Sequence, residues 1–216
     1  MKKYKLLLIV IIEFSCIRSN AQDLALHSQN SQRLIIGSRE DSSKSKNTKY
    51  FIAYDFGEAA FNKFKSLGSE IGVRFKNDHL LRLAYTNLHL SEEHLSSNFA
   101  KAVDGEKVKG KQVGYEVFYD FPVFAKGLYV SPSMGYYTHE YQHTQLDEQL
   151  NNSSFTFGSA ISYTETDLFK IKGLYYRFSI PLRFHLTPIE ETQLGDTTIN
   201  SNTFDNSICF FIGYEF

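Results

Sequence analysis

Large apolar side chains occupy every second position in the last segment of this chain. Ile208, Phe210, Ile212, Tyr214 and Phe216 alternate with Cys209, Phe211, Gly213 and Glu215. A period of two places the first five side chains on one face of a β-strand. Because so many large apolar groups on one face must be covered, that face has to meet either a protein core or lipid.

The same alternation recurs in seven earlier segments that are separated by turn-forming residues. The eight predicted strands are residues 49–57, 67–75, 80–90, 111–121, 128–141, 153–164, 172–186 and 204–216. Most have about the length that a tilted strand needs to cross a bilayer. The sequence therefore predicts an all-β fold, an eight-stranded antiparallel up-and-down transmembrane β-barrel over residues 49–216.

The predicted connections between these strands alternate in length, and each odd-numbered one is longer than every even-numbered one. An up-and-down meander places odd connections at one end of the barrel and even ones at the other. Outer-membrane barrels have long outer loops and short periplasmic turns. We therefore expect both ends of the barrel domain in the periplasm, with Lys76-Asn77-Asp78 as the tightest turn.

The two faces of the predicted strands differ in size and charge. One parity carries large apolar groups such as Tyr115, Val117 and Tyr119, and no charged residue interrupts it. The other parity carries small residues and charges. Because the interior of an eight-stranded barrel is barely wide enough for its side chains, the large apolar parity is predicted to face lipid. A soluble lipocalin-like barrel, with that parity turned inward around a ligand, is the alternative.

The inward charges form the candidate site. Its basic members are predicted to be all arginine, whose planar fork can pair two carboxylates and stays charged when buried. The predicted lumen ion-pair cluster comprises Asp55, Glu70, Arg74, Arg82, Glu116, Asp120, Arg177, Arg183 and Glu215, with His185 at its outer end. We interpret the cluster as a structural plug of mutually satisfied ions. A conducting or gated path is the alternative.

The beginning of the sequence has the charged, apolar and small-residue regions of a secretory signal peptide, which predicts cleavage after Ala21. Cys16 permits a rival interpretation as a lipoprotein cysteine, which Glu13 and Phe14 disfavour. Residues 22–48 are rich in Ser, Asn, Gln and Lys, and we expect a flexible periplasmic segment.

Loss of residues 1–21 would remove four of the 23 basic and one of the 24 acidic residues, leaving a formal net charge of −4. A mildly acidic chain without basic blocks gives no indication of nucleic-acid binding. Cys209 would be the one remaining cysteine, so an internal disulfide is excluded.

The chain resembles the small eight-stranded outer-membrane barrels of the OmpA/OmpX type, in the version common in Bacteroidetes. The resemblance covers residues 49–216 and depends on the strand pattern, the loop asymmetry, the segment Leu174–Phe184 and the terminal Phe216. It implies location in the bacterial outer membrane and a monomer among outer-membrane lipids and lipopolysaccharide. It also implies that the barrel-assembly machinery reads Phe210, Ile212, Tyr214 and Phe216.

Two patterns invite enzymatic interpretations. His139-Glu140-Tyr141-Gln142-His143 spells a zinc-peptidase motif, but on a strand the two histidines would lie about 13 Å apart, too far to share a zinc ion. His139, His185, Ser131 and Ser133 could serve a lipid A-modifying hydrolase at the membrane rim, although no motif selects them. We therefore predict no catalytic residues, no metal and no cofactor.

The outer loops are expected to carry whatever recognition the protein performs. The largest, Ser91–Gly110 and Thr187–Thr203, are polar and predict solvated surfaces. The resulting prediction is a structural or surface-interaction protein whose loops contact a surface protein or a host partner. A narrow channel and a lipid-modifying enzyme are the alternatives.

Overall fold

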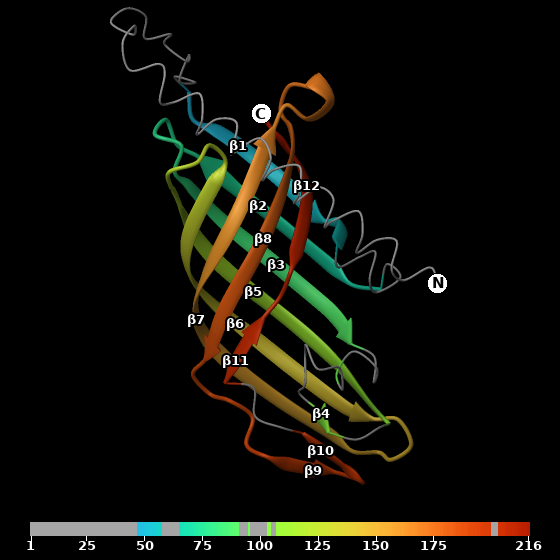
Figure 1. Cartoon of the computed structure of the whole chain (residues 1–216). Helices are drawn as coiled ribbons and strands as arrows, with labels where there is room; N and C mark the ends of the chain where they lie inside the picture. The colour runs from blue at the N-terminus through green and yellow to red at the C-terminus, as the bar shows by residue number, and fades with distance from the viewer. Residues whose placement is uncertain (1–46, 58–64, 91–94, 96–102, 105–106, 200–202) are drawn as a thin grey trace, which may run out of the picture. The chain divides into compact units, whose positions relative to one another are not determined.

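The computed structural model describes residues 47–57, 65–90, 95, 103–104, 107–199 and 203–216 (Figure 1). The strands are β1 (Lys49–Asp55), β2 (Leu67–Arg74), β3 (Leu80–Leu90), β4 (Val103–Asp104), β5 (Val108–Pro122), β6 (Leu128–His143), β7 (Gln149–Thr166), β8 (Leu174–His185), β9 (Thr192–Leu194), β10 (Thr197–Ile199), β11 (Phe204–Asn206) and β12 (Cys209–Glu215). A short 3₁₀ turn, η1 (Leu168–Lys170), lies between β7 and β8. Within the described ranges, no helix is long and apolar enough to cross a membrane.

The large sheet closes on itself. Strands β1, β2, β3, β5, β6, β7 and β8 each pair antiparallel with the next. The circle is completed by β11 and β12, which both pair with β8, and by β12, which also pairs with β1. The predicted eight-stranded antiparallel up-and-down barrel is therefore confirmed.

The predicted eighth strand is divided into β11 and β12, although both keep one register against β8. Asn206 pairs with Leu182 and Cys209 pairs with Ser179, and the pairing lapses at the position that faces Pro181. Proline has no N–H with which to continue the ladder. A single backbone bond, from Ser207 N–H to Pro181 O at 3.3 Å, spans the gap.

The predicted alternation of long and short connections is wrong at one connection. The connection between β6 and β7 comprises residues 144–148, whereas that between β7 and β8 comprises residues 167–173. The expected outer loop is short because its flanking residues continue the ladder as far as Gln142 opposite Gln149. In Figure 1, β5, β6 and β7 accordingly run further toward the loop end than β1 and β2 do.

The large apolar parity faces outward, as predicted. The side chains of this parity on the barrel strands are exposed or half-buried. The exposed ones include Ile52, Ile71, Leu81, Tyr115, Val117, Val130, Met134, Phe155, Phe157, Ile161, Phe178, Ile180, Ile212 and Tyr214. Water could not cover an apolar surface of this extent on a monomer. The exterior is therefore that of a membrane-spanning barrel, and the lipocalin-like alternative is wrong.

Small residues on the inward parity make room for large inward side chains. A Cβ atom at Gly114 would lie 2.1 Å from Cδ1 of Tyr137, which belongs to the neighbouring strand β6. The absence of a side chain at Gly114 thus lets the Tyr137 ring lie flat against β5 and reach the lumen charges.

The predicted signal peptide, residues 1–21, lies outside the described residues. So does the predicted periplasmic segment, residues 22–48, apart from Asn47 and Thr48. Both stay predictions.

Candidate functional site

The inward charges lie in three groups along the barrel. We call these the terminal, central and outer groups, in order from the end where β1 begins toward the long loops. Every second residue of each strand faces inward, so the groups follow directly from the register of the sheet.

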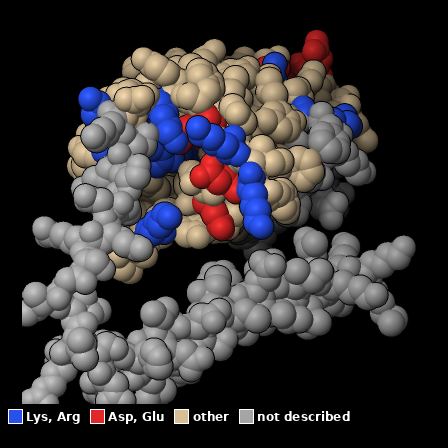
Figure 2. Space-filling view, turned by 90° about the horizontal axis from the view of Figure 1, so that it is seen from above, with Lys and Arg blue, Asp and Glu red and all other residues tan. Residues whose placement is uncertain are grey.

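The terminal group closes the end where the described chain starts and finishes. Glu215 accepts from Lys49 Nζ at 2.6 Å and also pairs with Arg74 Nε. Arg74 Nη1 donates to the Tyr129 hydroxyl at 2.7 Å. Seen from this end in Figure 2, basic and acidic side chains lie side by side on the face of the barrel.

The central group contains two arginines and two carboxylates. Arg82 holds Asp120 with two bonds, from Nε at 2.8 Å and from Nη2 at 3.0 Å, and reaches Glu70 with Nη1 at 2.8 Å. Arg177 Nη1 donates to the other oxygen of Glu70 at 2.8 Å, and its Nε donates to Thr164 at 2.9 Å. The four charged side chains are at most 1% exposed and sum to zero formal charge.

Aromatic rings complete the central group. The Arg82 guanidinium lies 4.3 Å from the centre of the Phe118 ring, and that of Arg177 lies 5.3 Å from the Phe51 ring. Such contacts stabilise a desolvated cation. The lumen at this height is therefore filled by rings and paired ions.

The outer group centres on Arg183. Its Nε donates to Glu116 at 2.6 Å, and its Nη1 donates to Asp205 at 3.1 Å. Glu116 also accepts from Ser133 and Tyr137, each at 2.7 Å. The Nε2 atom of His185 lies 3.2 Å from Asp205.

The structure brings most of the predicted cluster together, but it places one member differently. Asp55 lies at the seam between β1 and β12, where its Oδ1 accepts a hydrogen bond from the Phe210 N–H at 3.2 Å. The Cβ of Asp55 also lies where a side chain at Gly68 would have to go. None of the ion pairs described above includes Asp55.

Sequence reasoning missed Lys49 and Asp205 as members. The expectation that the inward cations are all arginine is wrong at Lys49, whose side chain lies at the barrel mouth and keeps 36% exposure. A lysine tolerates this place because its ammonium is only partly desolvated. Both residues have the inward parity of their strands, so a stricter use of parity would have included them.

The four residues predicted as the assembly signal face outward on or beyond β12. Tyr214 and Ile212 are exposed, and the Phe216 ring stacks on that of Tyr50 with centroids 6.3 Å apart. Reciprocal backbone bonds between Phe216 and Tyr50 seal the end of the seam. Their recognition by assembly machinery stays a prediction.

The described residues of the long outer loops form a structured cap, which corrects the expectation that these loops are merely solvated. Strands β4, β10 and β9 make a small antiparallel sheet. Leu194 of β9 and Ile199 of β10 join an apolar cluster with Leu95, Val108, Tyr141 and Ile189. These apolar residues are few and lie scattered within polar segments, so no local periodicity predicts that they form a cluster.

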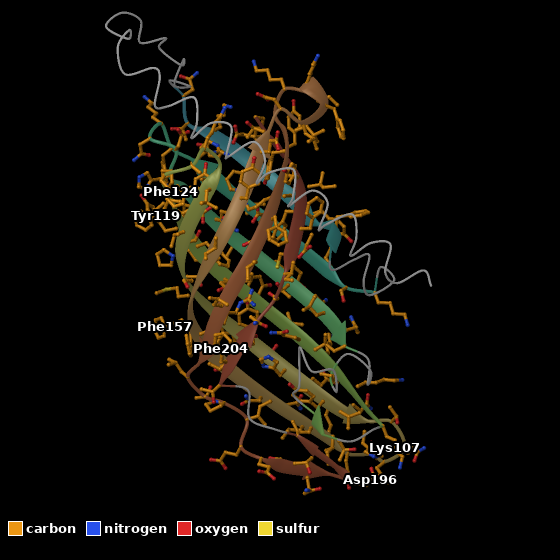
Figure 3. All side chains as sticks on the ribbon, in the orientation of Figure 1. Lys107, Tyr119, Phe124, Phe157, Asp196 and Phe204 are labelled. Carbon is orange, nitrogen blue, oxygen red and sulfur yellow. The ribbon has the colours of Figure 1, made fainter. Side chains whose placement is uncertain are left out.

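An ion pair joins two of the loops of this cap. Lys107 Nζ lies 2.7 Å from Asp196 Oδ2, and both residues are labelled at the loop end in Figure 3. His143 Nε2 lies 3.3 Å from the other Asp196 oxygen, while its Nδ1 accepts from the Leu146 N–H at 2.9 Å. Hydrogen bonds from Lys107 and His143 lower the pKa of Asp196 to about 2.

The two enzymatic patterns do not form catalytic sets. His139 and His143 both face inward on β6, where the His139 ring packs 5.4 Å from that of His185 and His143 meets Asp196. Among the described residues, no cluster of three or more His, Cys, Asp or Glu side chains could hold a metal ion. Ser133 donates to Glu116, and no hydrogen bond joins Ser131 or Ser133 to a histidine in the described part of the chain.

No protein-family model matches this sequence, and no curated protein is significantly similar to it. Several solved structures are similar to it, including the following three. The N-terminal β-barrel domain of Pseudomonas aeruginosa OprF is 15% identical, covering 79% of this chain and 98% of that one, with a TM-score of 0.38. Ail, the attachment invasion locus protein of Yersinia pestis, is 11% identical, covering 78% and 96%, with a TM-score of 0.39. A major outer membrane protein from Thermus thermophilus is 11% identical, covering 79% and 100%, with a TM-score of 0.41.

Proposed function

We propose that this chain is an integral outer-membrane barrel with a sealed lumen, which acts through the surface of its structured outer loops rather than by catalysis or conduction. The observation that carries the proposal is the pairing of an apolar, aromatic exterior with a lumen filled by paired ions, in which Arg177 Nη2 is the buried charged-group atom without a hydrogen-bond partner among the described residues. An apolar exterior is stable in lipid, and a closed barrel encloses the paired ions of the lumen away from that lipid.

The central group supports a structural lumen. Its two arginines and two carboxylates use their charges on one another, and aromatic rings pack against both guanidinium groups. A permeation path requires groups that can bind an ion and release it again. Buried ions held by two or more short hydrogen bonds are instead suited to fixing one arrangement of the strands.

The cap supports a surface-interaction role. A loop with its own apolar cluster and a small sheet can present a fixed surface, which lowers the entropy lost when a partner binds. The cap contains such a cluster around Ile199, and Lys107 and Asp196 join its loops. The partner would be a surface protein or a host protein.

Two measurements test the proposal. On an outer-membrane fraction, the protein should migrate on a detergent gel as a compact species that shifts on boiling, because a closed barrel resists the detergent until heated. In planar bilayers, the purified protein should give no conductance steps above the baseline current.

Failure of the gel shift, or recovery of the protein in a soluble fraction, would contradict the membrane assignment. Discrete conductance steps would replace the sealed lumen with a channel. A change in lipid A acylation on expression of the protein would favour a lipid-modifying enzyme instead.

A further inference from the structure

The exterior of β5, β6 and β7 changes from apolar to polar within a few residues. An aromatic row made by Tyr115, Tyr136 and Phe155 lies across the three strands, with the Tyr136 and Phe155 rings 4.9 Å apart. The next outward row toward the loops is Val113, Thr138 and Ser153, and the row after it is Lys111, Glu140 and Asn151. Aromatic rows of this kind mark the membrane–water interface.

A groove of about 570 Å³ is hollowed in this surface, just beyond the aromatic row. Its lining includes Lys111, Tyr136, Thr138, Glu140, Asn151 and Ser153. Its size falls within the range of about 300–1,000 Å³ that small-molecule sites occupy. The groove therefore lies where the headgroup of an outer-leaflet lipid would lie if the barrel is in the membrane as proposed above.

The charged groups of the groove and the Asn151 amide are available to a ligand, whereas the Thr138 hydroxyl donates to Val113 O at 3.3 Å and can only accept from a ligand. Although Lys111 and Glu140 are directly opposite each other in the ladder, neither makes an ion pair with any described residue. The Asn151 amide oxygen accepts from Gln149 Nε2 at 3.1 Å, which leaves its own NH₂ group to donate. Lys109, two positions beyond Lys111 on the same face of β5, is exposed and adds a second positive charge.

This lining suits a phosphorylated sugar better than a simple phospholipid headgroup. The hydroxyl of Thr138 on β6 and the amide and hydroxyl of Asn151 and Ser153 on β7 can bond to the hydroxyls of a sugar ring, which a phosphodiester group itself lacks. The ammonium of Lys111 can pair with a phosphate, and Glu140 can accept from a sugar hydroxyl. Below the groove, Phe155, Phe157 and Met134 continue the wall with apolar surface on which acyl chains can lie.

We propose that this groove binds the phosphorylated amino-sugar headgroup of an outer-leaflet glycolipid, with Lys111 on the phosphate and Thr138, Asn151 and Ser153 on the sugar. The inference rests on the proposed membrane location, and it names a lipid partner for one wall of the barrel. Occupancy would anchor β5–β7 at the height where they leave the bilayer.

Native mass spectrometry of the detergent-purified protein tests the site with three probes: diphosphorylated lipid A, its monophosphorylated form and phosphatidylglycerol. We expect the wild-type protein to retain the diphosphorylated form in preference to phosphatidylglycerol. In Lys111→Glu, retention should fall at least about tenfold, because a charge-assisted bond to phosphate is replaced by repulsion. Asn151→Leu should weaken binding of both glycolipids, since it removes a sugar contact.

The matched control is Lys126→Glu, a charge reversal at an exposed lysine in the turn between β5 and β6 at the opposite end of the barrel. It should bind as the wild type does. Equal retention of phosphatidylglycerol, or unchanged glycolipid retention in both Lys111→Glu and Asn151→Leu, would overturn the inference. Each variant is first checked for the heat-dependent gel shift, so loss of the barrel, which would contradict the proposed function, is distinguished from loss of the lipid.

Discussion

At the scale of single residues, the central arginines illustrate why a buried charge is tolerated in this lumen. Arg177 is fully buried and donates to Glu70 and Thr164. Taking such a charge out of water costs several kcal/mol, and only its hydrogen-bonded partners offset that cost. Replacing one ion of the group therefore destabilises the fold more than replacing the whole neutral group of ions with apolar side chains.

Replacement of Arg177 by methionine should destabilise the barrel by roughly 3–5 kcal/mol, because it leaves the Glu70 carboxylate with one cation fewer in a buried place. Urea unfolding in detergent micelles or bilayers measures the change. Lys126→Met, at an exposed turn lysine, is the control and should be nearly neutral. Unchanged stability of Arg177→Met would indicate that water, not protein, solvates these ions.

A second residue-scale prediction concerns Gly114. Substitution by alanine would force the Tyr137 ring out of its place and should cost about 1–3 kcal/mol as an overpacked core does. A double-mutant cycle with Tyr137→Leu measures the coupling. We expect the double variant to lose clearly less than the sum of the two single losses. Additive losses would show that Gly114 is needed for some other reason.

At the scale of elements, the outer loops behave as a small unit built on the ends of β5, β6 and β7. The sheet of β4, β10 and β9 and the apolar cluster around Ile199 give the unit its own core. The ion pair of Lys107 and Asp196 ties the loop before β5 to the turn between β9 and β10. The cap should therefore loosen without unfolding of the barrel walls.

Asp196 provides the pH dependence of this unit. Its pKa in the folded protein is about 2, lowered by hydrogen bonds from Lys107 and His143. Because the folded value is below the unfolded one, the stabilisation is complete above the unfolded pKa and is lost as the pH falls through the folded pKa. A carbon-13 NMR titration of the carboxyl should give a midpoint near 2, and Lys107→Met should raise it. An ordinary midpoint in the wild type would disprove the contact.

At the scale of the whole molecule, two solvents shape the protein at once. Lipid selects the large apolar groups on the outside. The lumen holds small residues and paired charges together with inward aromatic rings such as Phe51, Tyr175 and Phe211, which were not predicted from the sequence. The same period of two satisfies both demands in each strand. In contrast to a soluble protein, the barrel has its apolar surface on the outside and its ion pairs on the inside.

A charge placed on the outer wall tests this arrangement. Phe157 is 52% exposed on β7, and Phe157→Arg should destabilise the folded barrel by about 2–4 kcal/mol, less if the site lies near the interface. Phe124, which is 96% exposed in the turn between β5 and β6, is the matched control, and Phe124→Arg should be tolerated. Figure 3 labels both residues. Folding into lipid vesicles followed by urea titration gives the comparison, and equal losses at the two sites would argue against a lipid-facing wall.

The sequence by itself determined the barrel, the face that each strand turns to lipid and the identity of most inward charges. It could do so because side-chain alternation and strand length are local properties of the chain. Tertiary structure decided which groups meet: Arg177 contacts Glu70 across 107 positions, and Asp55 accepts a hydrogen bond from the backbone of β12. It also decided that scattered apolar residues in polar loops form a cap. Pairings of this kind depend on the register and closure of the whole sheet, which no local pattern contains.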